Sequence, residues 1–132
     1  AAYHGYWDTL IAANDPPDPD HPDLERYATG AALDRMRDTI RRHREQRHAL
    51  RLRAGGAYAH RPSVTDLDAG RALVEDCSLD DGLVVDRATG VVLDDSVWTR
   101  KTVVEMTRTA DRWRVSLVTL EGKWQGTVDC ET

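Results

Sequence analysis

Apolar residues at the start of the chain recur with helical spacing. Pro16 and Pro17 end this pattern, because proline lacks a backbone donor and disfavours helix in the residue before it. Before them, five aromatic and aliphatic residues occupy positions i, i+3, i+4, i+7 and i+8, which form one stripe of a helix: Tyr3, Tyr6, Trp7, Leu10 and Ile11. The pattern predicts a first helix that buries this stripe.

Two further helices are predicted after an acidic, proline-rich connector at 15–22. Pro22 suits the first position of a second helix, with Asp20 or His21 as its cap. A third helix is expected from about residue 31 to 47. Its inner side would carry Leu33, Met36 and Ile40, and its outer side arginines.

The period of the pattern changes after Gly55 and Gly56. Short segments rich in Val, Leu, Thr and Trp, separated by turn residues, are typical of strands. Helices followed by strands favour an α+β fold over a parallel α/β sheet. We therefore expect one domain, residues 1–132, with a helical part at 1–47 and an antiparallel sheet part at 48–132. Strands are predicted near 49–54, 57–60, 63–68, 71–77, 83–86, 91–93, 98–109, 112–120 and 124–129.

The net charge of −5 is unevenly distributed. Residues 35–53 contain eight arginines but only two acids, whereas residues 66–132 contain fourteen of the 23 acids. The arginine-rich segment could bind a polyanion, or it could lie across the acidic sheet or face water, which is the commoner outcome for such runs. No apolar stretch approaches the roughly 18 residues of a membrane span.

Cys77 and Cys130 are the two cysteines of the chain, and neither has metal-ligand spacing around it. A structural zinc site would need four clustered ligands. From the residues alone, two free thiols and one disulfide both remain open. A disulfide would imply an oxidising compartment.

Several short motifs resemble those of small secreted proteins and lipoproteins of actinobacteria. They are Tyr27–Leu33, Val64–Leu67, Ala72–Cys77, Asp86–Gly90 and Arg112–Val115, with the final Cys130. The resemblance implies a cone-shaped fold like that of nuclear transport factor two, in which helices pack into a curved antiparallel sheet. It also implies export, a lipidated cysteine upstream of the first helix, and a disulfide between Cys77 and Cys130. That family has no agreed activity, and so it supplies no catalytic residue and no cofactor.

The first functional hypothesis is a non-catalytic accessory protein of the cell envelope that binds a small ligand or partner inside the cone. The candidate ligand-binding residues are Tyr6, Tyr27, His60, Asp86 and Trp98. The alternative is an enzyme of the cyclase or isomerase type, which needs a carboxylate or histidine base in an apolar cavity. Its candidate bases are Asp8, His60 and Asp86, although Asp8 is expected to point outward and Asp86 to cap a turn.

Other ligands and partners are less favoured by the sequence. The acidic connector lacks the glycine and glutamate landmarks of an EF-hand, so we expect no metal site. An acidic chain without a recognisable motif is not expected to bind nucleic acid. If the chain has a protein partner, we expect it to be a second copy of the chain, bound through the open face of the sheet.

Overall fold

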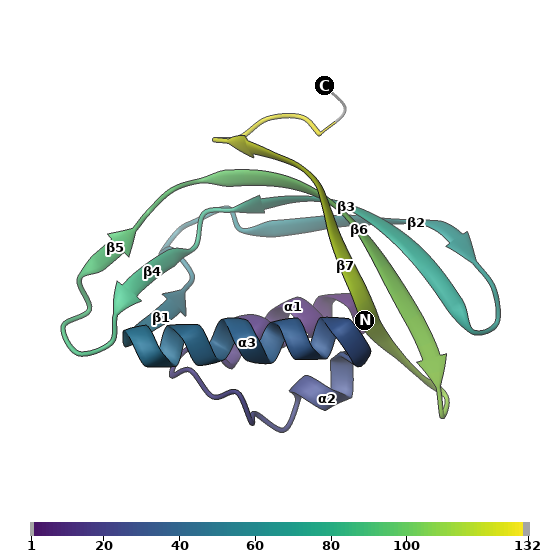
Figure 1. Cartoon of the computed structure of the whole chain (residues 1–132). Coiled ribbons are helices and arrows are strands. Elements are labelled where there is room, and N and C mark those ends of the chain that lie inside the picture. The colour runs from purple at the N-terminus through teal and green to yellow at the C-terminus, as the bar shows by residue number, and fades with distance from the viewer. Residues whose placement is uncertain (1, 131–132) are drawn as a thin grey trace.

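Three helices lie on the concave side of an arched antiparallel sheet in the computed structural model of the chain, which describes residues 2–130 (Figure 1). The helices are α1 (Ala2–Ala12), α2 (Leu24–Tyr27) and α3 (Gly30–Gln46). Helix α3 begins where Gly30 adopts a positive φ of 56°, a conformation that glycine reaches without a steric penalty. The α+β class and the packing of helices against a curved sheet are confirmed.

The strands form two antiparallel sheets. The large sheet has the order β2-β3-β6-β7, and the small sheet has the order β1-β4-β5. The large sheet is arched, and its ladders contain register shifts, which increase local twist and bend strands. The strands are β1 (His48–Arg51), β2 (Ala59–Leu67), β3 (Arg71–Asp80), β4 (Leu83–Asp86), β5 (Val92–Asp94), β6 (Trp98–Thr109) and β7 (Arg112–Gln125).

Two pairs of predicted strands prove to be single strands. Segments 57–60 and 63–68 are merged in β2, although Pro62 lies inside it. Proline is tolerated there because β2 is at the edge of the large sheet, where one side of the strand needs no donors. Segments 112–120 and 124–129 are likewise joined in β7, which ends at Gln125 and accommodates Gly122 opposite Lys101.

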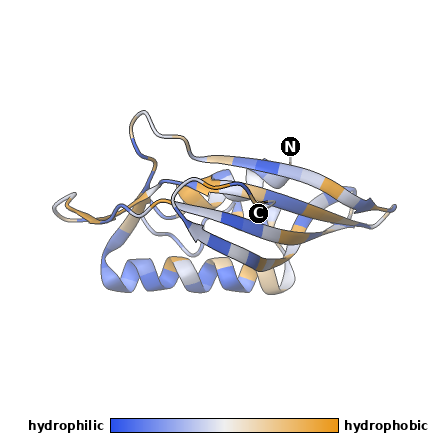
Figure 2. Ribbon diagram, turned by 90° about the horizontal axis from the view of Figure 1, so that it is seen from above, coloured by the Kyte–Doolittle hydropathy of each residue, from blue (hydrophilic) through white to orange (hydrophobic). Residues whose placement is uncertain are grey.

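The core lies between the three helices and the concave face of the large sheet. Residues of β3 alternate between buried and more exposed positions, as expected for a strand with one covered face. Figure 2 shows mostly hydrophilic residues along α3. No helix among residues 2–130 has the length and apolarity needed to cross a membrane. The main apolar core side chains are Leu24, Ala32, Met36, Ile40, Val74, Val104, Met106 and Val115.

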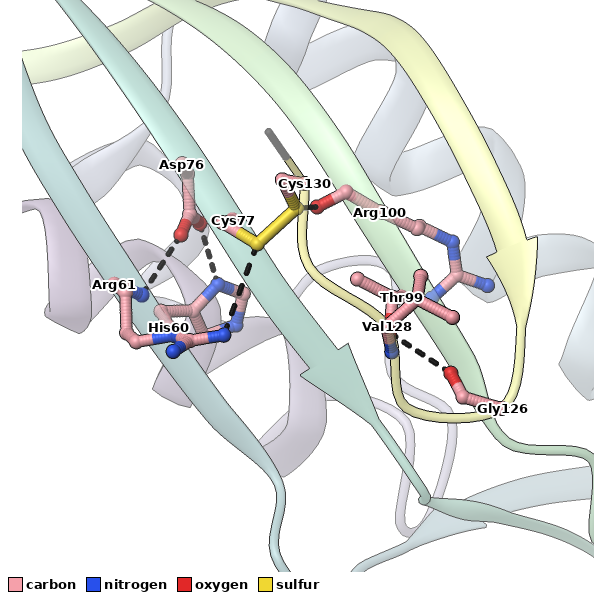
Figure 3. Close-up of a disulfide and its surroundings, with 9 residues drawn as sticks. All are labelled: His60, Arg61, Asp76, Cys77, Thr99, Arg100, Gly126, Val128 and Cys130. Atoms are coloured by element: carbon pink, nitrogen blue, oxygen red, sulfur yellow. Dashed lines mark hydrogen bonds and ion pairs between the residues drawn. A yellow bond between two sulfur atoms is a disulfide. The ribbon is translucent and has the colours of Figure 1, made fainter. Parts of the chain in front are cut away.

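A disulfide joins Cys77 to Cys130 (Figure 3), which confirms the pairing that the resemblance implies. Cys77 lies inside β3 rather than at its end, because the strand continues to Asp80. Cys130 lies in the segment after β7, which Thr99 also holds by accepting a hydrogen bond from the Val128 amide and donating one to the Gly126 carbonyl. The bridge therefore fastens the C-terminal segment to the middle of the sheet, on the face opposite the helices.

Removing this disulfide should destabilise the protein strongly. The bridge closes a loop of 53 residues, and the chain-entropy model assigns such a loop about 4 kcal/mol. We expect the Cys77→Ala/Cys130→Ala double variant to lose about that much unfolding free energy in a urea titration. The unfolded, unreduced wild type should contain no reactive thiol, and titration of two thiols would contradict the bridge.

Candidate functional site

A cleft of about 460 Å³ opens between the helices and the concave face of the large sheet. Its walls come from α1, α3, the small sheet and strands β2, β3, β6 and β7. Aromatic and aliphatic side chains provide much of its lining, including Trp7, Leu10, Leu50, Trp98 and Leu120. A wider hollow of about 760 Å³ lies on the outer face of α3, but it is an open surface lined largely by charged side chains. The cleft is therefore the better candidate for a ligand site.

The Asp76 carboxylate lies behind His60, which lines this cleft, and it accepts three hydrogen bonds. Its side chain is 0% exposed. Oδ2 accepts from the Tyr3 hydroxyl at 2.5 Å and lies 2.6 Å from Nδ1 of His60, while Oδ1 accepts from the Arg61 amide at 2.9 Å. These donors come from α1 and β2, so the carboxylate joins the first helix to two strands of the sheet.

The hydrogen bonds keep Asp76 ionised. Burial alone would raise the pKa of this carboxyl, but the hydrogen bonds from His60 and Tyr3 and from the Arg61 amide outweigh burial and lower its pKa below the usual range. Burial, reinforced by Asp76, has the opposite effect on Tyr3 and raises the pKa of its phenol. At neutral pH the Tyr3 phenol therefore stays protonated and donates its hydrogen bond to the ionised Asp76 carboxylate.

His60 connects this carboxylate to a second phenol. An ionised carboxylate can only accept, so the Nδ1 atom of His60 carries the proton. Nε2 lies 2.7 Å from the Tyr58 hydroxyl and, in the neutral ring, accepts a hydrogen bond from it. Burial first, and then the nearby acids Asp80 and Asp8, raise the pKa of Tyr58. The chain Asp76–His60–Tyr58 therefore ends in a protonated phenol at the cleft.

Aromatic contacts fix the position of the His60 ring. The Trp7 indole stacks on it with centroids 4.6 Å apart, and Tyr58 and Tyr3 meet it edge-on. The His60 side chain is only 7% exposed. The ring of Tyr6, whose pKa burial raises to about 12, packs edge-on against Trp7. This part of the wall is rigid and holds its hydroxyl and imidazole groups in fixed directions.

Two cations on neighbouring strands, Arg100 of β6 and Lys123 of β7, also line the cleft. Nη1 of Arg100 is 2.6 Å from Oδ2 of Asp80. The Lys123 ammonium lies over the Trp98 ring, 4.0 Å from its centroid. The site thus combines an apolar interior, a hydroxyl–imidazole wall and a cationic wall.

The structure brings three of the sequence candidates together and leaves the others apart. Tyr6, His60 and Trp98 line the cleft. Tyr27 does not line it, because its ring packs over Gly5 of α1 and under the Arg26 guanidinium. Asp86 is also outside the cleft, where Oδ1 accepts hydrogen bonds from the Ala88 and Thr89 amides, the turn-capping role expected from the sequence. Asp8, one of the candidate bases, is exposed on α1.

Sequence reasoning missed Asp76, Tyr58 and the cationic pair. The available signal was the alternation along β3, where Ala72, Val74, Asp76 and Ser78 share one face. An aspartate in an otherwise buried register indicates a charge that needs partners. Tyr58 carries no comparable signal, because it precedes its strand and reaches the site only through the fold.

Most of the arginine-rich segment 35–53 has acceptors within the chain. Arg35 donates to the Val118 carbonyl, and Arg53 to two carbonyls. Four others donate to side chains: Arg37 to Glu25, Arg41 to Asp38, Arg42 to Thr39 and Arg51 to Asp15. The three ion pairs, of Arg37, Arg41 and Arg51, partly neutralise the segment. The hydrogen bonds to neutral acceptors orient the other guanidinium groups and leave their charge in place. Within residues 2–130, no group of three His, Cys, Asp or Glu side chains is placed to hold a metal ion.

Comparison with known proteins gives a fold and no family. No family model and no curated protein matches the sequence. Among the solved structures, the intermembrane space region of the chloroplast protein ARC6 is similar, with a TM-score of 0.64 and 19% sequence identity over 90% of each chain. At that identity the similarity shows the α+β fold alone.

The Asp76 network makes a pH-dependent contribution to stability. Because the folded pKa of Asp76 is lowered, its stabilisation is present above the unfolded value near 4 and is lost as the pH falls through the folded value. We expect Asp76→Asn to lower the unfolding free energy by about 2–3 kcal/mol at pH 7, and by progressively less below about pH 4. Urea titrations across this range measure the difference.

The exposed Asp8 provides the control for this series. Asp8→Asn should change the unfolding free energy by less than about 0.5 kcal/mol at every pH. An Asp76→Asn effect that stays constant down to pH 2 would show that the carboxylate charge is not what stabilises the fold.

Proposed function

We propose that this chain is a non-catalytic binding domain of a protein exported to the cell envelope, and that it holds a small, largely apolar ligand in the cleft. The observation that carries the proposal is the cleft itself, about 460 Å³ in volume and lined by a preformed aromatic wall. Ligand sites of proteins are typically concave, of roughly 300–1,000 Å³, and apolar with a few fixed polar groups. The cleft has all of these properties.

The disulfide supports an extracytoplasmic location. Disulfides persist in oxidising compartments and are rare in a reducing cytoplasm, and the Cys77–Cys130 bridge leaves no free cysteine in the described chain. The resemblance of the sequence motifs to secreted actinobacterial proteins is in line with the same assignment. In this proposal, the protein binds its ligand outside the membrane.

Filling the cleft should abolish binding. Thr39 is half-buried on α3 and lines the cleft, so an indole at this position would occupy the ligand volume. We expect the wild type to bind the uncharged fluorophore 1-aminoanthracene saturably, and Thr39→Trp to bind it about tenfold more weakly or not at all. The fluorescence titration measures this directly.

Glu45→Trp is the matched control, because Glu45 is exposed on the outer side of the same helix. It should bind the fluorophore like the wild type. Equal affinities of the wild type and both variants would place the fluorophore outside the cleft and contradict the proposal.

A second candidate is proton-transfer chemistry of the cyclase or isomerase type. One observation favours it: His60 is buried in the cleft wall and is oriented by Asp76, as a general acid–base histidine must be. In such a reaction, Nε2 would exchange a proton with the ligand through the Tyr58 hydroxyl. The oriented imidazole distinguishes this candidate from simple binding.

Hydrogen exchange distinguishes the two candidates. An enzyme of this type should accelerate deuterium uptake from D2O at the carbon beside the carbonyl of an apolar ketone such as 2-decalone, followed by mass spectrometry. His60→Gln should lose this acceleration and still bind 1-aminoanthracene. Uptake at the buffer rate with the wild type would remove the enzymatic candidate and leave the binding domain.

A further inference from the structure

The cationic side chains of the cleft are not all neutralised. Four cationic side chains line the cleft: Arg35, Arg51, Arg100 and Lys123. Arg100 is paired with Asp80 and Arg51 with Asp15, whereas Arg35 donates only to the neutral Val118 carbonyl. Lys123 forms no ion pair among the described residues 2–130. Asp94, which also lines the cleft, interacts with it electrostatically: the pKa of Asp94 is lowered mainly by hydrogen bonds from Ser96 and further by the Lys123 charge. In a chain with a net charge of −5, a cleft with surplus positive charge stands out from its surroundings.

The two cations on the strand pair face each other directly. Arg100 of β6 and Lys123 of β7 are register partners, and both line the cleft. Like charges at directly opposite positions of an antiparallel pair destabilise the sheet. Asp80 relieves this repulsion at Arg100 through an ion pair, whereas Asp94, which also lines the cleft, acts on Lys123 through space without forming an ion pair. Lys123 therefore still lacks a directly bound anion.

Lys123 is exposed, and its ammonium contacts the cleft lining at Trp98. It lies 4.0 Å from the centroid of the Trp98 ring, and the cation–π attraction restrains the flexible lysine side chain. Trp98 itself lines the cleft, as do Leu120 of β7 and Leu83 of β4. A molecule that rests its apolar body on these side chains would bring a terminal charge to the two cations.

We propose that the ligand of the cleft is an amphipathic anion: an apolar body with one carboxylate or phosphate headgroup, bound between Arg100 and Lys123. This inference rests on the proposed function of the cleft as a ligand site. An anion at this position neutralises the cross-strand repulsion, and its apolar part is removed from water by the aromatic and aliphatic lining. The net effect is selection for anionic over neutral or cationic molecules of the same length.

Displacement of bound 1-aminoanthracene tests the charge preference. Four ligands with the same ten-carbon chain are compared at pH 7, below their micelle concentrations: decanoate, decyl phosphate, decanol and decylamine. We expect the two anions to displace the fluorophore at about three- to fivefold lower concentration than decanol, and decylamine to be the weakest. The order of decanoate and decyl phosphate shows which headgroup is preferred.

Lys123→Gln should remove the preference, so that decanoate and decanol become nearly equal. Lys101→Gln is the matched control, because it removes the same charge from the neighbouring position of β6, which is opposite Gly122 and does not line the cleft. Equal displacement by decanoate and decanol with the wild type, or equal losses in both variants, overturns this inference while the cleft remains a ligand site. Absence of saturable fluorophore binding overturns the proposed function as well.

Discussion

The buried charge of Asp76 is the constraint on which the architecture depends. A carboxylate with no solvent exposure is strongly destabilising unless donors surround it. Its donors come from α1 and from β2, so the charge is accommodated only when the first helix and the edge strand are both docked on β3. The positions of Trp7 and His60, and with them one wall of the cleft, follow from this requirement.

The same strand also anchors the opposite face of the molecule. Consecutive residues of a strand point to opposite sides, so Asp76 faces the helices and Cys77 faces away. The carboxylate secures the N-terminal helix, and the disulfide secures the C-terminal segment, on the two sides of β3. Asn14 links the helices to the small sheet. Its side-chain amide donates a hydrogen bond to the Leu10 carbonyl, and its Oδ1 atom is hydrogen-bonded to Nδ1 of His43. The backbone carbonyl of Asn14 accepts from the Leu50 amide of β1. The Asp76 and Asn14 contacts hold the helices on the concave side, where the cleft lies, and the disulfide secures the sheet from its other face.

The sequence predicts the elements of this fold better than its site. Helical and strand periods are local properties, and they identify α1, α3 and the long hairpin of β6 and β7. The strand boundaries near Pro62 and Gly122 were misplaced, because whether such residues interrupt a strand depends on edge position and register, which a sequence alone does not display. The contact between Tyr3 and Asp76 spans 73 positions. Neither residue has a neighbour in the chain that indicates the other, and the Arg100–Lys123 pair likewise depends on the register of two strands.

The direction of the Tyr58 pKa shift bears on the choice between ligand binding and proton-transfer catalysis. A catalytic phenol that transfers protons at neutral pH needs a pKa lowered towards 7, whereas burial and the surrounding carboxylates raise the pKa of Tyr58. A phenol held protonated in an apolar wall is suited to donate or accept a hydrogen bond, which is a means of recognition. The His60 imidazole is occupied on both nitrogens, by Asp76 and by Tyr58, so it reaches a ligand only through that phenol. The geometry that orients the histidine for catalysis therefore also keeps it from acting directly on a ligand, and this is the reason for proposing binding rather than catalysis.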